Sequence, residues 1–441
     1  MASRILLLSS AIAACSAASV LAPRDDAPSP GMLSLPIEHR QFVRPMVVKR
    51  QEDTNVPLLN YTTLNYMVAR SNGQKVQVTI DTGSDELWVS PDCQDSSLSS
   101  LQERLCVSNG KYSPSTSTTS DALGTSSRIP YGKGSVRFNY YADTIALPDS
   151  TINLKNVTFG VATSSEDIYA GIMGLSYGNG VNLKYNNFVD ELVRQNVTKT
   201  KAFTIALGSS DVNKGGVLIF GGADTKKWTG PLARLPILPP QGRERIARYW
   251  VQMDAVGMTL GGNAKTYSGG NLPVVVDSGS SLTYLPSSIV SGIAADLKGE
   301  YNRNYGFYFV DCKLKASRDT VDFTFSGFRL AVSLNEFIWD LGDGKNCVIG
   351  AQAVTSDTGI TALLGDSFMR SAYTIFDQTS GAVYMGQYQN CGQNEVAIDS
   401  ASGPGNLTGE CKAEKKSAGA RVGASAAALA ASLGVAVVGL L

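Results

Sequence analysis

One stretch of this chain occurs twice, and the repeat limits the folds that the chain can adopt. Residues 76–89 read VQVTIDTGSDELWV and residues 272–286 read LPVVVDSGSSLTYLP. In both, an apolar run leads into an aspartate, Asp81 or Asp277, followed by a hydroxyl residue, glycine and serine. A second apolar stretch with glycine follows each copy, at 171–178 and at 362–369. An internal repeat of this kind predicts two similar lobes.

The composition indicates what these lobes are made of. The chain has 441 residues, of which 43% are hydrophobic and 17% charged, so it can bury one large core or two ordinary ones. Its 44 glycines and 18 tyrosines favour strands and turns over long helices. We therefore expect a mainly β protein. A net charge of zero gives no basic footprint for nucleic acid, so no nucleic-acid partner is expected.

Histidine excludes several kinds of catalytic site. The one histidine, His39, precedes the dibasic pair Lys49-Arg50, which is typical of a processing site in a secreted precursor. If the chain is cut after Arg50, the mature protein has no imidazole, which excludes Ser-His and Cys-His nucleophiles and His-ligated zinc. The remaining chemistry must use carboxylates, tyrosine, lysine or the backbone, without a metal or cofactor.

The N-terminal segment has the features of a secretory address. Residues 1–18 combine an early charge at Arg4, the apolar run ILLLSSAIAA and small residues at Ser16 and Ala18. This pattern predicts a signal peptide, against the alternative of a short buried helix. Residues 19–50 are then a basic pro-segment that could cover an acidic cleft, with Lys49 and Arg50 as its processing site.

The C-terminal segment has the features of a lipid-attachment signal. Small residues from Ser417 to Gly419 precede an apolar tail without charge after Arg421. The pattern predicts a glycosylphosphatidylinositol (GPI) anchor at or near Ser417, with residues 417–441 as the attachment signal that is removed and 396–416 as a stalk. The alternative is a transmembrane helix, but the Ala-rich stretch barely reaches bilayer length.

Cysteines and glycosylation triplets also suit a secretory route. Without Cys15 of the signal, six cysteines remain and permit fifteen pairings. The simplest closure joins nearest neighbours, and no C-x-x-C spacing favours a metal, so disulfides are expected. The expected pairs are Cys93 with Cys106, Cys312 with Cys347, and Cys391 with Cys411. The N-x-[ST] triplets begin at Asn60, Asn156, Asn196 and Asn406.

The paired aspartates predict acid–base chemistry. A tight turn through Gly83 or Gly279 points backbone N–H groups at the preceding carboxylate, and the Ser84 or Ser280 hydroxyl offers another donor. Two carboxylates that face each other cannot both ionise readily, so the pair holds one proton over a wide acidic range. One member can take a proton from water while the other gives one to a carbonyl oxygen. A third copy of the tripeptide, at Asp357, follows polar Thr355 and Ser356 and predicts only a surface turn.

Over about residues 60–390 the chain resembles the pepsin-like aspartic proteases, family A1. Both Asp-[Thr/Ser]-Gly-Ser sites fit, as do VLIFGGADTKKWTG (217–230) and LLGDSFMRSAYTIFD (363–377), and IPYGKGSV (129–136) resembles the flap hairpin over the substrate. The resemblance implies two β lobes, 51–235 and 236–395, with a cleft between them, each giving one aspartate. It implies catalytic Asp81 and Asp277, hydroxyls of Thr82 and Ser278 that brace the lobes, and Trp88 as hydrogen-bond partner of the flap tyrosine. The flap residues are Tyr131, Gly132, Lys133, Gly134 and Ser135.

Among such proteases the chain looks most like fungal yapsins and other secreted fungal members. Lys133 is a departure in the flap, because relatives often carry an acidic or hydroxyl residue there. A cation at that place should repel basic substrate side chains, so a preference for bulky apolar residues is expected. The expected function is a secreted, monomeric endopeptidase acting on proteins at acidic pH and touching membranes only through its lipid anchor. The alternatives are a non-catalytic binding or inhibitory protein of this fold and a structural cell-wall protein.

Overall fold

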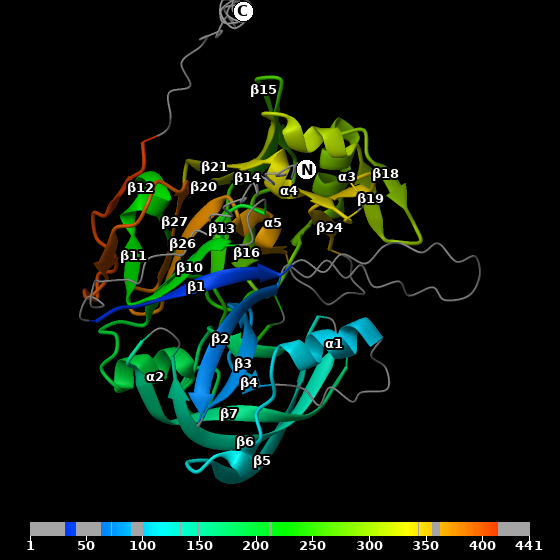
Figure 1. Ribbon diagram of the computed structural model, residues 1–441. Coiled ribbons are helices and arrows are strands. Elements are labelled where there is room, and N and C mark those ends of the chain that lie inside the picture. The colour runs from blue at the N-terminus through cyan, green and yellow to red at the C-terminus, as the bar shows by residue number, and fades with distance from the viewer. Residues whose placement is uncertain are drawn as a thin grey trace, which may run out of the picture.

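The computed structural model describes residues 31–40, 63–71, 73–89, 100–132, 134–147, 150–166, 168, 170–210, 214–242, 244–342, 344–354 and 362–412. Within these ranges the chain is mainly β, with twenty-nine strands and five short α-helices. Figure 1 shows the strands gathered into a lower lobe, drawn in blue to green, and an upper lobe drawn largely in yellow. The prediction of a mainly β protein with two lobes is confirmed.

The first lobe is one curled part of a large sheet. Its strands are β2 (Thr63–Ser71), β3 (Gln74–Asp81), β4 (Leu87–Val89), β5 (Asp121–Pro130), β6 (Ser135–Ala146), β7 (Asn153–Glu166) and β8 (Gly171–Gly174), and its helices are α1 (Ser100–Ser108) and α2 (Phe188–Arg194). They pair in the order β2-β3-β8-β4-β7-β6-β5. Val76, Val78 and Ile80 of β3 are buried in the core, so apolar packing fixes the strand that ends at Asp81.

The second lobe consists of three smaller sheets. Their orders are β13-β16-β25-β17-β24, β15-β14-β20-β21 and β18-β19-β23-β22. The strands are β13 (Trp250–Met253), β14 (Ala255–Leu260), β15 (Asn263–Tyr267), β16 (Leu272–Val276), β17 (Thr283–Leu285), β18 (Glu300–Asn302), β19 (Phe307–Val310), β20 (Thr320–Phe325), β21 (Phe328–Ser333), β22 (Ile338–Asp340), β23 (Cys347–Ile349), β24 (Ala351–Ala353) and β25 (Leu363–Leu364), with helices α3 (Ser287–Asp296), α4 (Leu334–Phe337) and α5 (Asp366–Met369).

The two halves of the sequence also share strands of one sheet. The large sheet continues beyond the first lobe as β12-β27-β26-β9-β10-β1. Here β9 (Ala202–Ala206), β10 (Lys214–Phe220) and β12 (Trp228–Pro236) mix with β26 (Ala372–Asp377) and β27 (Ala382–Tyr388). Phe203 of β9 stacks on Phe376 of β26 with ring centroids 5.1 Å apart. Strands from both halves of the chain therefore lie side by side in one sheet.

Part of the predicted pro-segment is a strand inside this sheet. β1 (Leu33–Arg40) pairs antiparallel with β10 on one side and with β2 on the other. Leu33, Leu35 and Ile37 are buried in the core, in the alternation expected for a strand with one apolar face. Residues 33–40 of the predicted pro-segment are therefore built into the sheet, while residues 41–50 lie outside the described residues, so the covering role stays a prediction.

The predicted stalk is also folded in its described part, so that prediction was wrong for residues 396–412. β28 (Glu395–Ala397) pairs with β11 (Gly222–Asp224), and β29 (Thr408–Glu410) extends the large sheet at β12. Ile398 is buried, which gives this segment an apolar reason to pack on the body of the protein. Each strand is only three residues long and pairs with a segment far away in the chain, so no local pattern predicted the pairing.

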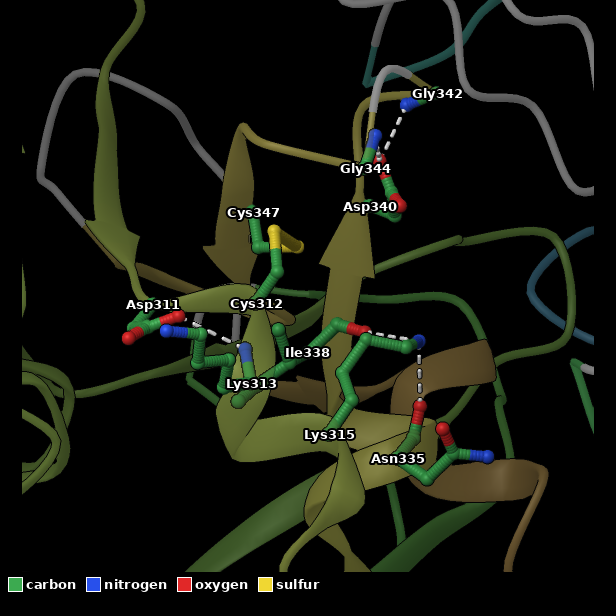
Figure 2. The surroundings of a disulfide bond; sticks show 10 residues. All are labelled: Asp311, Cys312, Lys313, Lys315, Asn335, Ile338, Asp340, Gly342, Gly344 and Cys347. Carbon is green, nitrogen blue, oxygen red and sulfur yellow. Dashed lines mark hydrogen bonds between the residues drawn. A yellow bond between two sulfur atoms is a disulfide. The ribbon is translucent and has the colours of Figure 1, made fainter.

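Two disulfides have the pairings that nearest-neighbour closure predicts. Cys312 is bonded to Cys347, and Cys391 is bonded to Cys411 next to β29. Cys106 is also disulfide-bonded, while Cys93 lies outside the described residues. Figure 2 shows Lys315 beside the first disulfide, where its Nζ donates to the Asn335 and Ile338 carbonyls at 2.9 and 3.0 Å.

Several predicted features fall outside the described residues. These are the signal peptide, Lys49, Arg50, Asn60, Lys133, Asp357, Ser417 and the tail after it. Of the predicted glycosylation sites, Asn156, Asn196 and Asn406 are all exposed. In the part of the chain that the structure describes, no helix has the length and apolar character to cross a bilayer.

Candidate active site

Each half of the chain delivers one aspartate by the same arrangement of strands. β3 runs parallel to β8 and ends with Asp81 opposite Gly174, and β16 runs parallel to β25 with Val276, next to Asp277, opposite Leu364. In each case a short strand, β4 or β17, then returns antiparallel to the partner strand. The internal repeat of the sequence is thus a repeat of pairing, and both copies end at a carboxylate.

The two carboxylates face each other across the turns that follow them. A Cβ built on Gly83 would lie 2.5 Å from Asp277 Oδ1, and one built on Gly279 would overlap Asp81 Oδ1. Each glycine therefore belongs to the turn of one aspartate and packs against the carboxylate of the other. Any side chain at Gly83 or Gly279 would occupy the space in which the pair meets.

Backbone and hydroxyl donors hold the carboxylates in place. The Gly83 amide donates to Asp81 Oδ1 at 2.8 Å, the Gly279 amide donates to Asp277 Oδ1 at 2.9 Å, and Ser84 Oγ donates to Asp81 Oδ2 at 2.5 Å. The corresponding expectation for Ser280 was wrong, because its hydroxyl donates to the Leu282 carbonyl at 3.1 Å. Asp81 consequently has one local side-chain donor that Asp277 lacks.

The hydroxyls of Thr82 and Ser278 join the two turns, as the resemblance implies. Thr82 Oγ1 donates to the Val276 carbonyl at 2.9 Å and accepts from the Ser278 amide at 3.0 Å. Ser278 Oγ donates to the Ile80 carbonyl at 2.8 Å and accepts from the Thr82 amide at 3.2 Å. Both side chains are buried, so water does not compete for these four bonds.

Electrostatics lets the pair retain a proton. Burial, followed by the neighbouring Asp81 carboxylate, raises the pKa of Asp277 well above its ordinary value, while Arg248 acts in the opposite direction. Asp81 is only 6% exposed. Because the two carboxyl groups face each other, a negative charge on one makes ionisation of the other less favourable.

The hairpin of β5 and β6 reaches over this pair. At its tip the Tyr131 amide donates to the Gly134 carbonyl at 3.0 Å, and Gly134 has a φ of 80°, which favours glycine. Trp88 is fully buried, and its Nε1 donates to the Tyr131 hydroxyl at 2.7 Å, as the resemblance implies. Burial and the nearby Asp81 charge raise the pKa of Tyr131, so its hydroxyl stays protonated.

Polar residues that the sequence interpretation passed over surround the first turn. Asp85 Oδ1 accepts from the Tyr177 amide at 2.9 Å and from Asn182 Nδ2 at 2.8 Å, and burial raises its pKa to about 6. Glu86 Oε2 accepts from the Tyr140 and Tyr185 hydroxyls at 2.5 and 2.6 Å. Their position directly after the Asp-Thr-Gly-Ser motif was the available signal.

Arg248 is a further residue of the site that the sequence did not single out. It lies just before β13, and its guanidinium donates to the Gly83 carbonyl and to Glu244. Nothing in the local sequence GRERIARYW distinguishes it from the neighbouring arginines, because only the tertiary structure brings it to the first lobe.

Comparison with known proteins agrees with this geometry. The family model described as eukaryotic aspartyl protease matches residues 68–388. The probable aspartic-type endopeptidase opsB of Aspergillus fumigatus is 33% identical over 79% of this chain and 74% of its own. Secreted aspartic protease 8 of Candida albicans is 33% identical over 72% of this chain and 73% of its own. Aspartic proteinase 3 of Saccharomyces cerevisiae is 31% identical over 67% of this chain and 54% of its own.

Proposed function

Since the chain belongs to the eukaryotic aspartyl protease family and is an aspartic-type endopeptidase, we propose that it is secreted and cleaves proteins at acidic pH with Asp81 and Asp277 as its catalytic pair. The assignment of this catalytic pair rests on one observation: the two carboxylates face each other across Gly83 and Gly279. Their common proton requires acid conditions, because deprotonation of both members would remove the acid.

The contacts of the pair suggest different roles for its members. Asp277, whose pKa is raised by burial and by Asp81, holds the proton and gives it to the carbonyl oxygen of the scissile peptide. Asp81 accepts hydrogen bonds from the Gly83 amide and Ser84 Oγ, which fix the orientation of its carboxyl group, and takes a proton from the attacking water. The resulting tetrahedral intermediate collapses when the leaving amine is protonated.

A substrate would lie extended between the carboxylate pair and the β5–β6 hairpin. Peptides bound in this way use backbone hydrogen bonds for affinity and side-chain pockets for selection. Tyr131, held by Trp88, is positioned to pack on such a peptide. We propose a preference for bulky apolar residues because Lys133 would repel basic ones.

The sequences of the two terminal segments support a location of this protein on the outer surface of a cell. The signal-like residues 1–18, the disulfides and the exposed triplet asparagines suit the secretory pathway, and the Candida albicans relative is named a secreted aspartic protease. We propose that a GPI anchor near Ser417 retains the monomeric enzyme on the membrane or passes it to the cell wall.

Two measurements test the activity. A denatured protein should be cleaved at about pH 4, and Asp81→Asn and Asp277→Asn should each abolish cleavage while the far-UV circular dichroism stays unchanged. A folded wild-type protein without activity would favour a binding protein, and an active Asp81→Asn variant would refute the catalytic pair. A diverse peptide library, with Lys133→Glu as a comparison, reports the preference.

A further inference from the structure

A short segment of the second half of the chain reaches the catalytic turn of the first. Arg248 Nη1 donates a hydrogen bond to the Gly83 carbonyl oxygen. Its Nε donates at 2.5 Å to Oε1 of Glu244, which lies four residues earlier in the same segment. The two side chains are largely buried, with 26% and 21% of their surfaces exposed, so the contact is only partly screened by water.

The peptide group of Gly83 connects Arg248 to the catalytic carboxylate. Its N–H donates to Asp81 Oδ1 at 2.8 Å, while the carbonyl of the same residue accepts from the guanidinium. A donor on this carbonyl restrains the turn that aims the Gly83 amide at Asp81. The positive charge also acts on Asp277 and Asp85, and it stabilises their ionised forms.

Asn182 anchors the segment to the first lobe. Its Nδ2 donates to the Ala247 carbonyl at 2.8 Å and its Oδ1 accepts from the Ala247 amide at 3.0 Å. The same Nδ2 donates to Asp85 Oδ1 at 2.8 Å. The residue before Arg248 is therefore bound by both of its backbone groups, so the guanidinium is delivered to a fixed place.

We propose that Arg248, with its charge partly balanced by Glu244, is a positioning residue that sets the pH range in which the Asp81–Asp277 pair works. The proposal rests on the proposed function of that pair. Residues 244–248, which lie outside the two repeated motifs, would thus tune the pH range of catalysis.

The charged and titratable groups around the pair fix the sign of the effect. Among the described residues, Arg248 is the cation that acts on Asp277, opposing burial and Asp81, and Tyr131 and Tyr284 are the neutral hydroxyl groups beside the carboxylates. The carboxyl groups behind this shell are Asp85, Glu86 and Glu244. Removal of the Arg248 charge should favour protonation of the pair, and removal of the Glu244 charge should favour ionisation.

Opposite shifts from the two members of one ion pair provide the test. We expect Arg248→Gln to move both limbs of the kcat/KM–pH profile upward by about 0.5–1 pH unit, whereas Glu244→Gln moves them downward. Arg248→Lys, which keeps the charge but not both hydrogen bonds, should leave the two limbs of the pH profile close to those of wild type even if kcat falls. Arg245→Gln removes an exposed charge from the same segment and serves as the matched control, with no shift expected.

The outcomes separate this inference from the proposed function. If wild type is active and Asp81→Asn inactive, but the Arg248→Gln and Glu244→Gln profiles coincide with wild type or move in the same direction, the tuning role is wrong while the catalytic pair stands. If wild type itself is inactive when folded, both fail. Should Arg248→Gln not fold, the downward shift of Glu244→Gln and the wild-type profile of Arg248→Lys decide the question.

Discussion

Thr82 and Ser278 exchange hydrogen bonds: each backbone amide donates to the hydroxyl of the other residue, at 3.2 Å from Thr82 and 3.0 Å from Ser278. Each hydroxyl also donates to the carbonyl of the residue that precedes the facing aspartate. Thr82 donates to Val276 and Ser278 donates to Ile80. The turns that follow Asp81 and Asp277 are thereby fixed to each other directly behind the carboxylates, so the distance between Asp81 and Asp277 depends on two small side chains.

Loss of one hydroxyl should therefore reduce activity and stability together. Thr82→Val keeps the shape of the side chain but leaves the buried Ser278 amide without its acceptor, at a cost of about 1–3 kcal/mol. We expect a lower free energy of unfolding in urea and a fall in kcat larger than any change in KM. Thr82→Ser retains the hydroxyl and should stay close to wild type; equal losses in both variants would contradict this account.

Stability should decline as the pH rises from acid to neutral. Burial raises the pKa of Asp85 from 3.8 to about 6 and that of Asp366 to about 7. Between pH 4 and pH 7 these groups keep protons in the folded state that the unfolded chain has lost, so unfolding becomes easier as the pH rises. One pKa unit corresponds to about 1.4 kcal/mol, so the total loss should reach several kcal/mol.

Asp366→Asn isolates one part of this pH effect. The amide cannot ionise, so the difference in unfolding free energy between pH 4 and pH 7 should shrink relative to wild type. Urea unfolding followed by tryptophan fluorescence at both pH values measures it. Asp399→Asn is a control, because that carboxylate is exposed and paired with Lys199. A variant with the full wild-type pH dependence would show that Asp366 is not responsible.

Cutting after Arg50 should not by itself release the N-terminal segment. β1 is paired on both sides, and Leu35 and Ile37 are almost wholly buried, so the strand is held by the sheet and the core. We expect the cut peptide to coelute with the protein in size-exclusion chromatography at neutral pH. Ile37→Asp should weaken that retention, and immediate loss of the wild-type peptide would contradict the prediction.

The uncut precursor tests whether the segment inhibits. A Lys49→Ala, Arg50→Ala precursor should be secreted folded but mostly latent at neutral pH, since a basic segment that reaches the carboxylate pair would hold it ionised. Full activity without shortening, measured together with intact mass, would show that residues 19–50 are not inhibitory. The pairing of β1 provides the attachment that such a segment needs.

Two truncations separate anchoring from folding at the C-terminus. Ending the chain at Lys416 should move activity from the cell-bound fraction to the medium, because the expected attachment signal is lost. Ending it at Asn394 should also lower stability by about 2–4 kcal/mol or more, because it removes β28, β29 and the Cys391–Cys411 disulfide. Activity that stays cell-bound after truncation at Lys416 would mean that another feature anchors the protein.

Local sequence patterns were sufficient to predict the two Asp-[Thr/Ser]-Gly-Ser motifs. The run of β-branched residues before Asp81 and Asp277 predicted strands, glycine predicted the turns, and the repetition of both predicted two lobes, because strand propensity and turn formation depend on neighbouring residues. The donors from Gly83 and Gly279 followed from the same local chemistry, and nearest-neighbour closure anticipated the pairs Cys312–Cys347 and Cys391–Cys411.

Only the tertiary structure decided the features that join distant segments. The sequence did not show that β1 and β28 belong to sheets, because both strands acquire their partners from elsewhere in the chain. Arg248 is one arginine among several until the fold places its guanidinium on the Gly83 carbonyl. Such contacts depend on how the two lobes pack together, and that packing has no local signature in the sequence.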